Sequence, residues 1–277
     1  MTNRIAFQGE PGAYSHEACA KYRPGMEALP CRTFEEVIDA VREGRADLAM
    51  LPVENSTYGR VADSHRLLPE SGLHIVDEGF IRVRIALMSL PGTTLDQVRH
   101  VRAHLVLLPQ ARAFLTRHGI AAHAAADSAG AAAELAQSRQ PGEGVLASEM
   151  AAQIYGLDVL ARDIEDHGHN TTRFLILSPT PDLSRRGDGK MITTFVFEVR
   201  NIPAALYKAM GGFATNGVNM TKLESYMVGG SFTATQFYSD IEGHPEDPNV
   251  KLALDELRYF TSSLKILGTY PADMVRG

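Results

Sequence analysis

Short apolar runs alternate with helix-like stretches along the first part of the chain. Apolar runs bounded by polar or turn-forming residues are typical of buried strands, and they occur at residues 4–9, 26–31 and 47–51. Between these runs, residues 15–22 and 33–44 have the composition and spacing of helices. Strands that alternate with helices usually pair in a parallel sheet, so the pattern predicts an α/β fold.

The stretch 33–44 carries signals for both ends of a helix. Thr33 is a suitable N-cap, and Glu36 three positions later completes a capping-box pattern. Gly44 can end the helix in the left-handed conformation, which costs glycine little. We therefore expect a complete helix between these residues.

A second set of strands and helices follows residues 80–90. In that stretch apolar residues alternate at Ile81, Val83 and Ile85, which predicts one long strand that crosses from one lobe to another. The later elements are expected at residues 110–119, 128–138, 143–148, 149–157 and 173–177. Two α/β lobes with a cleft between them result, and such sheets bind ligands beyond the carboxyl ends of their strands.

A break in composition divides the chain into two domains. Residues 178–190 gather Pro, Ser, Asp, Gly and charged residues without periodicity, as linkers do. We place the first domain at residues 1–180, the linker at 181–190 and the second domain at 191–277.

The second domain has a different order of elements. Its pattern predicts strand, helix, strand, strand, helix and strand, with Gly229–Gly230 as a two-residue hairpin turn between the middle strands. The last helix is expected at 250–264 and the last strand at 265–271. This βαββαβ order is that of the ferredoxin-like fold.

Composition and charge exclude several classes of function. The chain has 277 residues, 44% hydrophobic and 22% charged, enough to bury one large core or two smaller ones. Its net charge is -6 and its Lys and Arg residues are scattered, whereas nucleic-acid binding needs clustered positive charge. No apolar run approaches the ~18 residues of a membrane span, so we expect a cytoplasmic protein without membrane or nucleic-acid partners. Cys19 and Cys31 are too few for a disulfide framework and are expected to be reduced, buried thiols.

Two polar loops follow predicted strands, where strand ends should converge. In the first, Gly12 precedes a helix that Ser15 opens, so free backbone N–H groups could bind a carboxylate or phosphate. Simple capping of the helix explains the same residues equally well. In the second loop, Glu54, Asn55 and Ser56 follow an apolar strand, either as part of a binding site or as a polar turn.

A third polar loop enters the strand at 173–177. It places Asn170, Thr171, Thr172 and Arg173 at the strand edge, where a purely structural loop needs neither two hydroxyls nor a guanidinium. The alternative is that Thr simply favours strands and that Arg pairs with a surface carboxylate. These residues alone leave both interpretations open.

Taken together and in this order, the three loops resemble those of the prephenate dehydratase family. The loops read GEPGAYS at 9–15, PVENSTYGRV at 52–61 and NTTRF at 170–174, the last preceded by Asp166. The resemblance covers residues 4–271. It implies a two-lobed catalytic domain with an interlobe cleft, like that of periplasmic binding proteins, followed by an ACT regulatory domain of ferredoxin-like fold. The activity it implies is conversion of prephenate to phenylpyruvate, CO2 and water in L-phenylalanine biosynthesis.

The chemistry of that reaction agrees with these residue types. Loss of the ring hydroxyl and of CO2 makes the ring aromatic, so we expect neither a metal nor a redox cofactor. The resemblance implies catalytic roles for Thr172, Asn55 and Gln110 as hydrogen-bond donors to the leaving oxygen or to developing charge. Arg173 would bind a carboxylate through two parallel hydrogen bonds, whereas the role of Glu54 beside a dianion stays open. The substrate-binding residues that the resemblance implies are Ser15, Glu54, Ser56, Asn170, Thr171, Arg173 and Phe174.

Several positions depart from the family pattern. Ala103 stands where the family usually has a serine before His104, so the role of this histidine stays open. In the second domain Ala204 replaces a glycine, and Tyr226 and Met227 replace an Arg-Pro pair, which could alter feedback inhibition. The effector-binding residues that remain are Leu206, Asn219, Glu224 and Ser225. The resemblance also implies a homodimer or homotetramer, with the effector L-phenylalanine at the interface.

Two alternatives to this function remain open. Arogenate carries an amine where prephenate has a keto group, and its dehydration would give phenylalanine directly. A two-lobed cleft also describes solute-binding proteins, so the chain could be a non-catalytic amino-acid sensor. No chorismate mutase segment precedes the catalytic part, so we expect a monofunctional enzyme.

Overall fold

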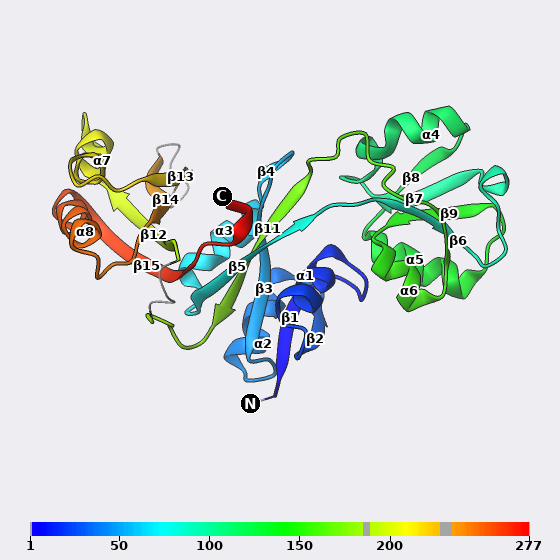
Figure 1. Cartoon of the computed structure of the whole chain (residues 1–277), viewed down its shortest axis with the longest axis horizontal. Helices are drawn as coiled ribbons and strands as arrows, with labels where there is room; N and C mark the ends of the chain where they lie inside the picture. The colour runs from blue at the N-terminus through cyan, green and yellow to red at the C-terminus, as the bar shows by residue number, and fades with distance from the viewer. Residues whose placement is uncertain (1, 185–188, 228–233, 277) are drawn as a thin grey trace. The chain divides into compact units, whose positions relative to one another are not determined.

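The computed structural model describes residues 2–184, 189–227 and 234–276 (Figure 1). Two predicted features lie outside the described residues: the turn at Gly229–Gly230 and residues 185–188 of the linker. The chain forms two compact units, one from Met1–Ser64 and Gly79–Phe174, the other from His65–Glu78 and Leu175–Gly277. Each compact unit combines two separate stretches of the chain, so these units do not test the predicted domain bounds at residues 180 and 190, which remain a prediction.

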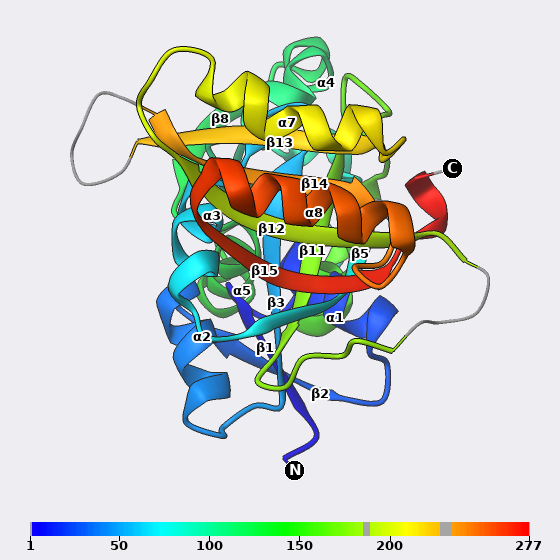
Figure 2. The same ribbon diagram turned by 90° about the vertical axis from the view of Figure 1, so that its left-hand side faces the viewer.

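The first unit begins with a sheet whose first strands are β1 (Arg4–Gln8), β2 (Glu27–Cys31) and β3 (Leu48–Asn55). β11 (Thr171–Ser178) lies beside β3, with its start at the end of that strand, and the order is β11-β3-β1-β2. β1 pairs in parallel with both β2 and β3, as the alternating pattern predicted. The helices α1 (Tyr14–Tyr22) and α2 (Phe34–Arg42) pack on opposite faces of these strands, as right-handed crossovers require (Figures 1 and 2).

The predicted ends of α2 are confirmed, but one half of its capping box is not. The Thr33 hydroxyl accepts a hydrogen bond from the Glu36 backbone N–H at 3.2 Å, and Gly44 has a φ of 72°. The Glu36 carboxylate, however, accepts from the backbone N–H of Arg32 at 2.8 Å and not from that of Thr33. The Glu36 carboxylate therefore holds Arg32, the residue before the N-cap Thr33.

The predicted long strand at 80–90 is two strands. β5 (His74–Arg82) ends and β6 (Ala86–Ser89) begins in a second sheet, so residues 83–85 cross between sheets, as expected of a segment between lobes. The second sheet has the order β10-β6-β9-β7-β8. Its other strands are β7 (His100–His104), β8 (Ala121–Ala125), β9 (Glu143–Ala147) and β10 (Asp158–Ala161), and its helices are α4 (Arg112–His118), α5 (Ser128–Ser138) and α6 (Glu149–Tyr155).

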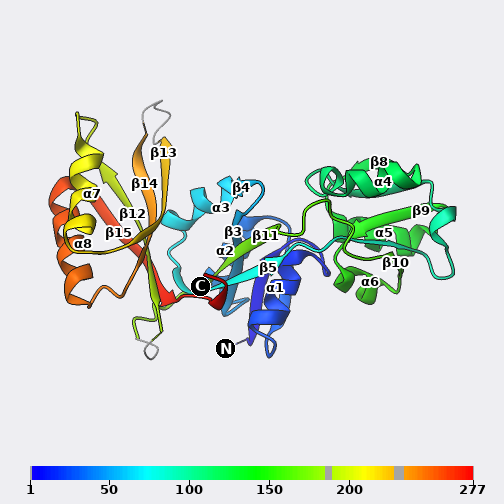
Figure 3. The same ribbon diagram turned by 45° about the horizontal axis from the view of Figure 1, so that its top comes forward.

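The second sheet has an apolar core on each face. Leu87 and Leu146 pack with Leu115 of α4 in one core. Their neighbours in sequence, Met88 and Val145, pack in another core with residues of α5 and α6. Successive residues of a strand point to opposite faces, so one strand sequence supplies both cores. Figure 3 shows α5 and α6 together along this sheet.

The second unit contains the predicted βαββαβ order. Its elements are β12 (Met191–Val199), α7 (Ala205–Thr215), β13 (Met220–Met227), β14 (Ala234–Glu242), α8 (Pro248–Phe260) and β15 (Thr261–Pro271). The strand order β13-β14-β12-β15 and the antiparallel pairing are those of a ferredoxin-like sheet. α7 and α8 lie side by side on one face of this sheet (Figure 2).

The predicted end of the last helix is wrong. α8 ends at Phe260, and the residues that follow already belong to β15, where Leu264 pairs with Phe197 of β12. The Thr-Ser-Ser run at 261–263 favours a strand and lies beside β12, so pairing overrides the helical spacing of Leu264. The short elements of the chain are β4 (Gly59–Arg60), α3 (Ala62–Leu67), η1 (Leu68–Glu70), η2 (Leu95–Gln97), η3 (Leu108–Ala111) and η4 (Met274–Arg276).

Candidate active site

The first unit contains a cavity of about 400 Å³. Its wall includes the end of β3, the start of β11, the loop after β7, and the N-terminal residues of α1 and α5. The predicted site residues that line it are Ser15, Asn55, Gln110, Asn170, Thr172 and Phe174. These residues come from four separate parts of the chain, and the fold brings them to one place.

The alternation of β11 decides which residues of the NTTRF motif reach the cavity. Thr172 and Phe174 line the cavity, whereas Thr171 and Arg173 are not among its lining residues. Arg173 is only 4% exposed, and its Nη1 lies 3.7 Å from Oε2 of Glu54, which also lies outside the lining. The structure therefore does not place Arg173 or Glu54 where a substrate carboxylate in this cavity would be.

Ser56 also serves the framework of the site. Its hydroxyl donates to the carbonyl of His169 at 3.0 Å and accepts from the backbone N–H of Thr171 at 3.0 Å. These bonds, with the Ser56 N–H to the Thr171 carbonyl at 2.9 Å, tie the loop after β3 to the start of β11. Ser56 thus holds the two loops in register and does not line the cavity.

A chain of side-chain amides connects Thr172 to the loop after β7. Asn55 Nδ2 donates to Thr172 Oγ1 at 3.0 Å and to Asn170 Oδ1 at 2.6 Å. Asn170 Nδ2 donates to Gln110 Oε1 at 2.5 Å, and Gln110 Nε2 donates to the carbonyl of Val106 at 2.7 Å. The predicted catalytic residues Thr172, Asn55 and Gln110 are thus part of one hydrogen-bonded network.

The direction of every bond in this amide chain is set by backbone groups at its two ends. Asn55 Oδ1 accepts from the backbone N–H groups of Thr57 and Tyr58, both at 2.9 Å, so Nδ2 must face Thr172. At the other end the Val106 carbonyl can only accept, so Gln110 must present its Nε2 there. The backbone groups at both ends therefore require the same donor-to-acceptor direction along the amide chain.

This orientation leaves the proton of Thr172 available to the cavity. The hydroxyl oxygen accepts from Asn55, and a hydroxyl has one proton to donate besides its acceptor sites. Within the part of the chain that the structure describes, the Thr172 side chain donates no hydrogen bond. Thr172 can therefore donate to a group bound in the cavity.

The glycine loop before α1 packs closely against α6. Gly12 has a φ of 93°, and a Cβ there would lie 2.7 Å from Cα of Ala151 in α6. The hydroxyl of Ser148 donates to the Gly12 carbonyl at 2.6 Å, and the hydroxyl of Tyr155 donates to the Pro11 carbonyl at 2.8 Å. The loop is thereby fixed against α6.

Simple capping by Ser15 is excluded by the geometry of α1. The helix begins at Tyr14 with Ala13 as its N-cap, which makes no side-chain cap bond, so Ser15 is an internal residue. Ala13, Tyr14 and Ser15 line the cavity. The positive end of the helix dipole therefore faces the cavity, where it favours an anion.

Sequence reasoning missed several polar residues of the cavity wall. Arg60 and Tyr58 line it from the turn that pairs β4 with the end of β3, and Asp127 and Ser128 line it from the start of α5. Arg60 lies in the quoted PVENSTYGRV loop, but its position depends on the pairing of Glu54 with Arg60.

His104, whose role was open, also lines the cavity. Its Nδ1 accepts from the backbone N–H of Val106 at 3.3 Å, and its own N–H group on the backbone donates to Ser128 Oγ at 2.9 Å. These bonds anchor the loop that carries Val106 and Gln110. The structure thus gives His104 a clear positioning role for that loop.

Two ionisable groups at the glycine loop are kept neutral. Burial raises the pKa of Tyr14 well above 10.0, with smaller contributions from Glu17 and Glu165, and its hydroxyl donates to the Arg84 carbonyl at 2.8 Å. Burial lowers the pKa of His16 below its ordinary 6.5, and its Nδ1 accepts from the Gly12 backbone N–H at 3.0 Å. A neutral imidazole is the form that can accept this bond.

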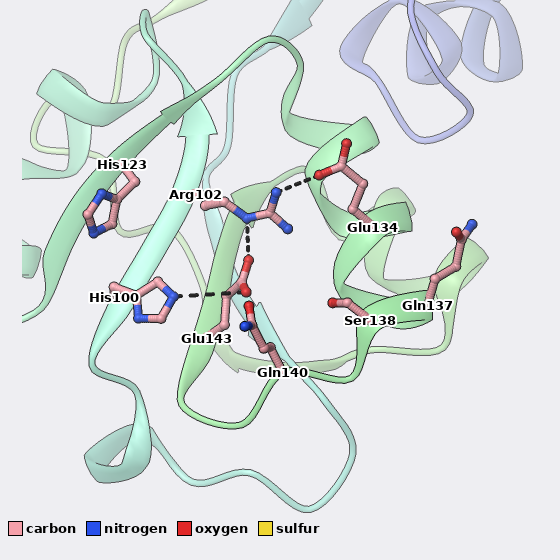
Figure 4. Close-up of a pocket in the computed structure, with 8 residues that line it drawn as sticks. All are labelled: His100, Arg102, His123, Glu134, Gln137, Ser138, Gln140 and Glu143. Carbon is pink, nitrogen blue, oxygen red and sulfur yellow. Dashed lines mark hydrogen bonds and ion pairs between the residues drawn. The ribbon is translucent and has the colours of Figure 1, made fainter.

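A larger and more open depression of about 830 Å³ lies on the second sheet (Figure 4). Arg102 of β7 forms ion pairs with Glu143 and, at 2.5 Å, with Glu134, while His100 Nε2 lies 3.9 Å from Glu143. None of the predicted site residues lines it. Its charged groups satisfy one another, and among the described residues no group of three or more His, Cys, Asp or Glu could hold a metal ion.

Only one of the predicted effector residues lines the pocket at the start of α7. Leu206 lines a pocket of about 270 Å³ at the start of α7, together with Ala204, whose φ is 61°. Asn219 donates to Glu242 Oε2 at 3.1 Å, and Glu224 lies 3.4 Å from Nζ of Lys222. Neither these two residues nor Ser225 lines the pocket that contains Leu206.

Comparison with known proteins assigns the chain to a family. A family model described as prephenate dehydratase matches residues 5–182. The chain belongs to the prephenate dehydratase family. The members of this family that it resembles carry names for more than one activity.

One similar member is a bifunctional N-acyl-homoserine lactone acylase/prephenate dehydratase of Komagataeibacter europaeus, 52% identical over 273 residues, 98% of this chain and 97% of that protein. Another is arogenate dehydratase/prephenate dehydratase 1 of Arabidopsis thaliana, chloroplastic, 38% identical over 287 residues, 99% of this chain and 73% of that protein. The crystal structure of a prephenate dehydratase from Arthrobacter aurescens in complex with L-Phe is 28% identical. It matches with a TM-score of 0.88 over 97% of this chain and 90% of that one. Within the described residues of this family member, no helix has the length and hydropathy to span a bilayer.

Proposed function

We propose that this protein is a prephenate dehydratase. The observation that carries the proposal is the hydroxyl of Thr172, which lines the cavity and accepts from Asn55 at 3.0 Å, so that its proton points away from that bond. A donor fixed in this way can assist the departure of a hydroxyl group, a contribution of roughly 10²- to 10⁴-fold for a well-placed general acid.

The reaction needs one proton donor and binding of two carboxylates. The C–O bond of the ring hydroxyl breaks, and the oxygen leaves as water after it takes a proton. The bond from the ring to its carboxylate also breaks, its electron pair enters the ring, and CO2 departs. Thr172 donates a hydrogen bond to the leaving oxygen, and Asn55 holds Thr172 in place. No metal or redox cofactor is needed, because the aromatic product drives the reaction.

Positive charge for the substrate carboxylates comes from two features of the cavity wall. Arg60 contributes a guanidinium, and α1 contributes its N-terminus at Ser15. Arg60 therefore replaces Arg173 as the proposed carboxylate ligand. Arg173, which pairs with Glu54 at 3.7 Å, supports β11 from its other face. Asn170 and Phe174 complete the proposed substrate-binding wall.

We also propose that residues 191–277 are an ACT regulatory domain that binds L-phenylalanine, with 1–180 as the catalytic domain and 181–190 as the linker. The βαββαβ order supports this proposal, as does the similar structure from Arthrobacter aurescens, which was solved with L-Phe. Among the proposed effector residues only Leu206 lines the pocket at the start of α7, which is consistent with a site that a second chain completes. This supports a homodimer or homotetramer. We place the enzyme in the cytoplasm. These effector residues are Leu206, Asn219, Glu224 and Ser225.

A second candidate activity is hydrolysis of the amide bond of N-acyl-homoserine lactones. The observation that favours it is the 52% identity, over 97% of its length, with a protein named for both activities. Arogenate is a second candidate substrate for the dehydration, since the similar protein from Arabidopsis thaliana is named for arogenate and prephenate. The chemistry of dehydration at Thr172 is the same for both.

Turnover by the purified protein tests these assignments. Prephenate is supplied and phenylpyruvate followed, in parallel with arogenate and phenylalanine formation, and with an N-acyl-homoserine lactone and release of the free amine. We expect the rate of phenylpyruvate formation to fall about 10²-fold or more in Thr172→Val, which keeps the shape of the side chain and removes the hydroxyl. Thr172→Ser keeps the hydroxyl and should retain most of the rate. Wild-type protein that forms no phenylpyruvate contradicts the proposal, and the other two substrates then decide between the alternatives.

A further inference from the structure

Exposed apolar side chains lie in the cavity wall and directly next to it in the sequence, and a small dianion does not need them. Leu105 is 65% exposed, Tyr58 47% and Val106 39%. Tyr58 and Val106 line the cavity, and Leu105 precedes Val106 in the loop after β7. We call these three side chains the apolar lip.

The apolar lip is held in place by hydrogen bonds. The Tyr58 hydroxyl donates to the Val106 carbonyl at 3.0 Å, and the same carbonyl accepts from Gln110 Nε2 at 2.7 Å. The Val106 backbone N–H donates to His104 Nδ1 at 3.3 Å. The lip therefore joins the end of the amide chain that leads to Thr172, and these bonds fix the Tyr58 ring and the Val106 backbone.

The apolar surface continues from the lip into the cavity. Leu107, Val83 and Phe174 line the interior beside the polar residues already described. An elongated ligand with a polar head and an aliphatic tail could place its head near Thr172 and extend its tail over the lip. Prephenate has no such tail.

We propose that the apolar lip binds the aliphatic chain of an N-acylated substrate whose polar head occupies the cavity. The proposal rests on the second candidate activity, amide hydrolysis, and names the part of the protein that would select the acyl chain. Exposed leucine and valine side chains gain from contact with methylene groups, because both surfaces leave water. Longer acyl chains, up to the length of the lip, should therefore bind more tightly.

Calorimetric binding of N-butanoyl-, N-hexanoyl- and N-octanoyl-homoserine lactone to the full-length protein tests the apolar lip. We expect Kd to fall about two- to fourfold per added methylene in the wild type, the upper value corresponding to complete burial at ~0.8 kcal/mol each. The dependence of Kd on acyl-chain length should become weaker in Leu105→Ser and in Val106→Thr; the second substitution conserves the shape of the side chain. Leu252→Ser, at a leucine of α8 that is 56% exposed, is the matched control and should retain it.

Calorimetry separates this proposal from the activity on which it rests. Chain-length-dependent binding without release of the free amine would support the lip and contradict amide hydrolysis. Amine release with affinities that do not depend on chain length would support hydrolysis and overturn the lip. Equal dependence on chain length in the wild type and both lip variants would also overturn it.

Discussion

Asn55 donates to Thr172 from an amide group whose oxygen is already occupied by two backbone N–H groups. The Nδ2 to Oγ1 distance is 3.0 Å, and the two bonds to Oδ1, from Thr57 and Tyr58, are both 2.9 Å. The amide thus has one possible orientation, and Thr172 is an acceptor in this pair. The residue that positions the proposed donor is fixed by the turn after β3.

Asn55→Asp should abolish this arrangement while preserving its shape. A carboxylate can still accept from Thr57 and Tyr58, but it would also accept from Thr172 and so take the proton that the substrate needs. We expect kcat for prephenate to fall about 10²- to 10³-fold, comparable to loss of one preorganised donor. Circular dichroism should show an intact fold. Activity close to that of the wild type would show that Thr172 does not need a hydrogen bond donated by residue 55.

Gly12→Ala should destabilise the first unit. A Cβ at this position would lie 2.7 Å from Cα of Ala151, and the φ of 93° is unfavourable for any residue with a side chain. We expect the free energy of unfolding to fall by about 2–4 kcal/mol, measured by urea denaturation. Gly25→Ala is the control, since nothing lies within 4 Å of its Cβ, and it should change stability far less. Equal effects of the two substitutions would contradict the close packing of the glycine loop.

Arg102→Ala should destabilise the protein without affecting the proposed active site. It leaves the carboxylate of Glu143, whose side chain is 3% exposed, without its guanidinium partner. The expected loss is about 1.5–3 kcal/mol of unfolding free energy, since the pair is partly open to solvent. Adding Glu143→Gln should recover part of the loss. Arg162→Ala removes an exposed ion pair with Glu149 and should cost about 0–1 kcal/mol.

Stability should decrease as the pH falls below 6.5, in part because of His16. Burial lowers the pKa of His16 in the folded protein below its ordinary value of 6.5, so the unfolded chain binds more protons in that range. The contribution of His16 is complete above pH 6.5 and is lost as the pH falls through its lowered pKa. His16→Asn keeps an acceptor for the Gly12 N–H and does not titrate. Thermal melts between pH 7 and pH 5 should therefore show a smaller loss for this variant than for the wild type; equal losses would exclude His16.

The elements that could be predicted are those whose signals are local. Thr33 and Gly44 mark the ends of α2 without reference to the rest of the chain, and both are confirmed. The βαββαβ order also followed from apolar spacing alone. The strands β7, β8 and β10 were not predicted, because a sequence such as Ala-Ala-His-Ala-Ala in β8 has little strand propensity and pairs only when β7 is beside it.

The site could be located from the sequence, but the residues that line the cavity could not be distinguished from those that lie behind its wall. The NTTRF motif identified β11, yet which of Thr172 and Arg173 reaches the cavity depends on which face of the sheet borders the cavity. Successive residues of a strand always point apart, so one of the two had to leave the site. Arg60 was missed because its place in the cavity wall depends on the turn that brings β4 back beside the end of β3.

The amide chain from Asn55 to Gln110 contains no group that titrates at ordinary pH. Its direction is set at one end by backbone N–H groups and at the other by a backbone carbonyl. The hydroxyl of Thr172 is therefore oriented in the same way in acidic and in alkaline solution, as long as the protein is folded. Any pH dependence of kcat near neutrality must then originate in groups outside the amide chain, that is, in the substrate or in ionisable residues of the cavity wall.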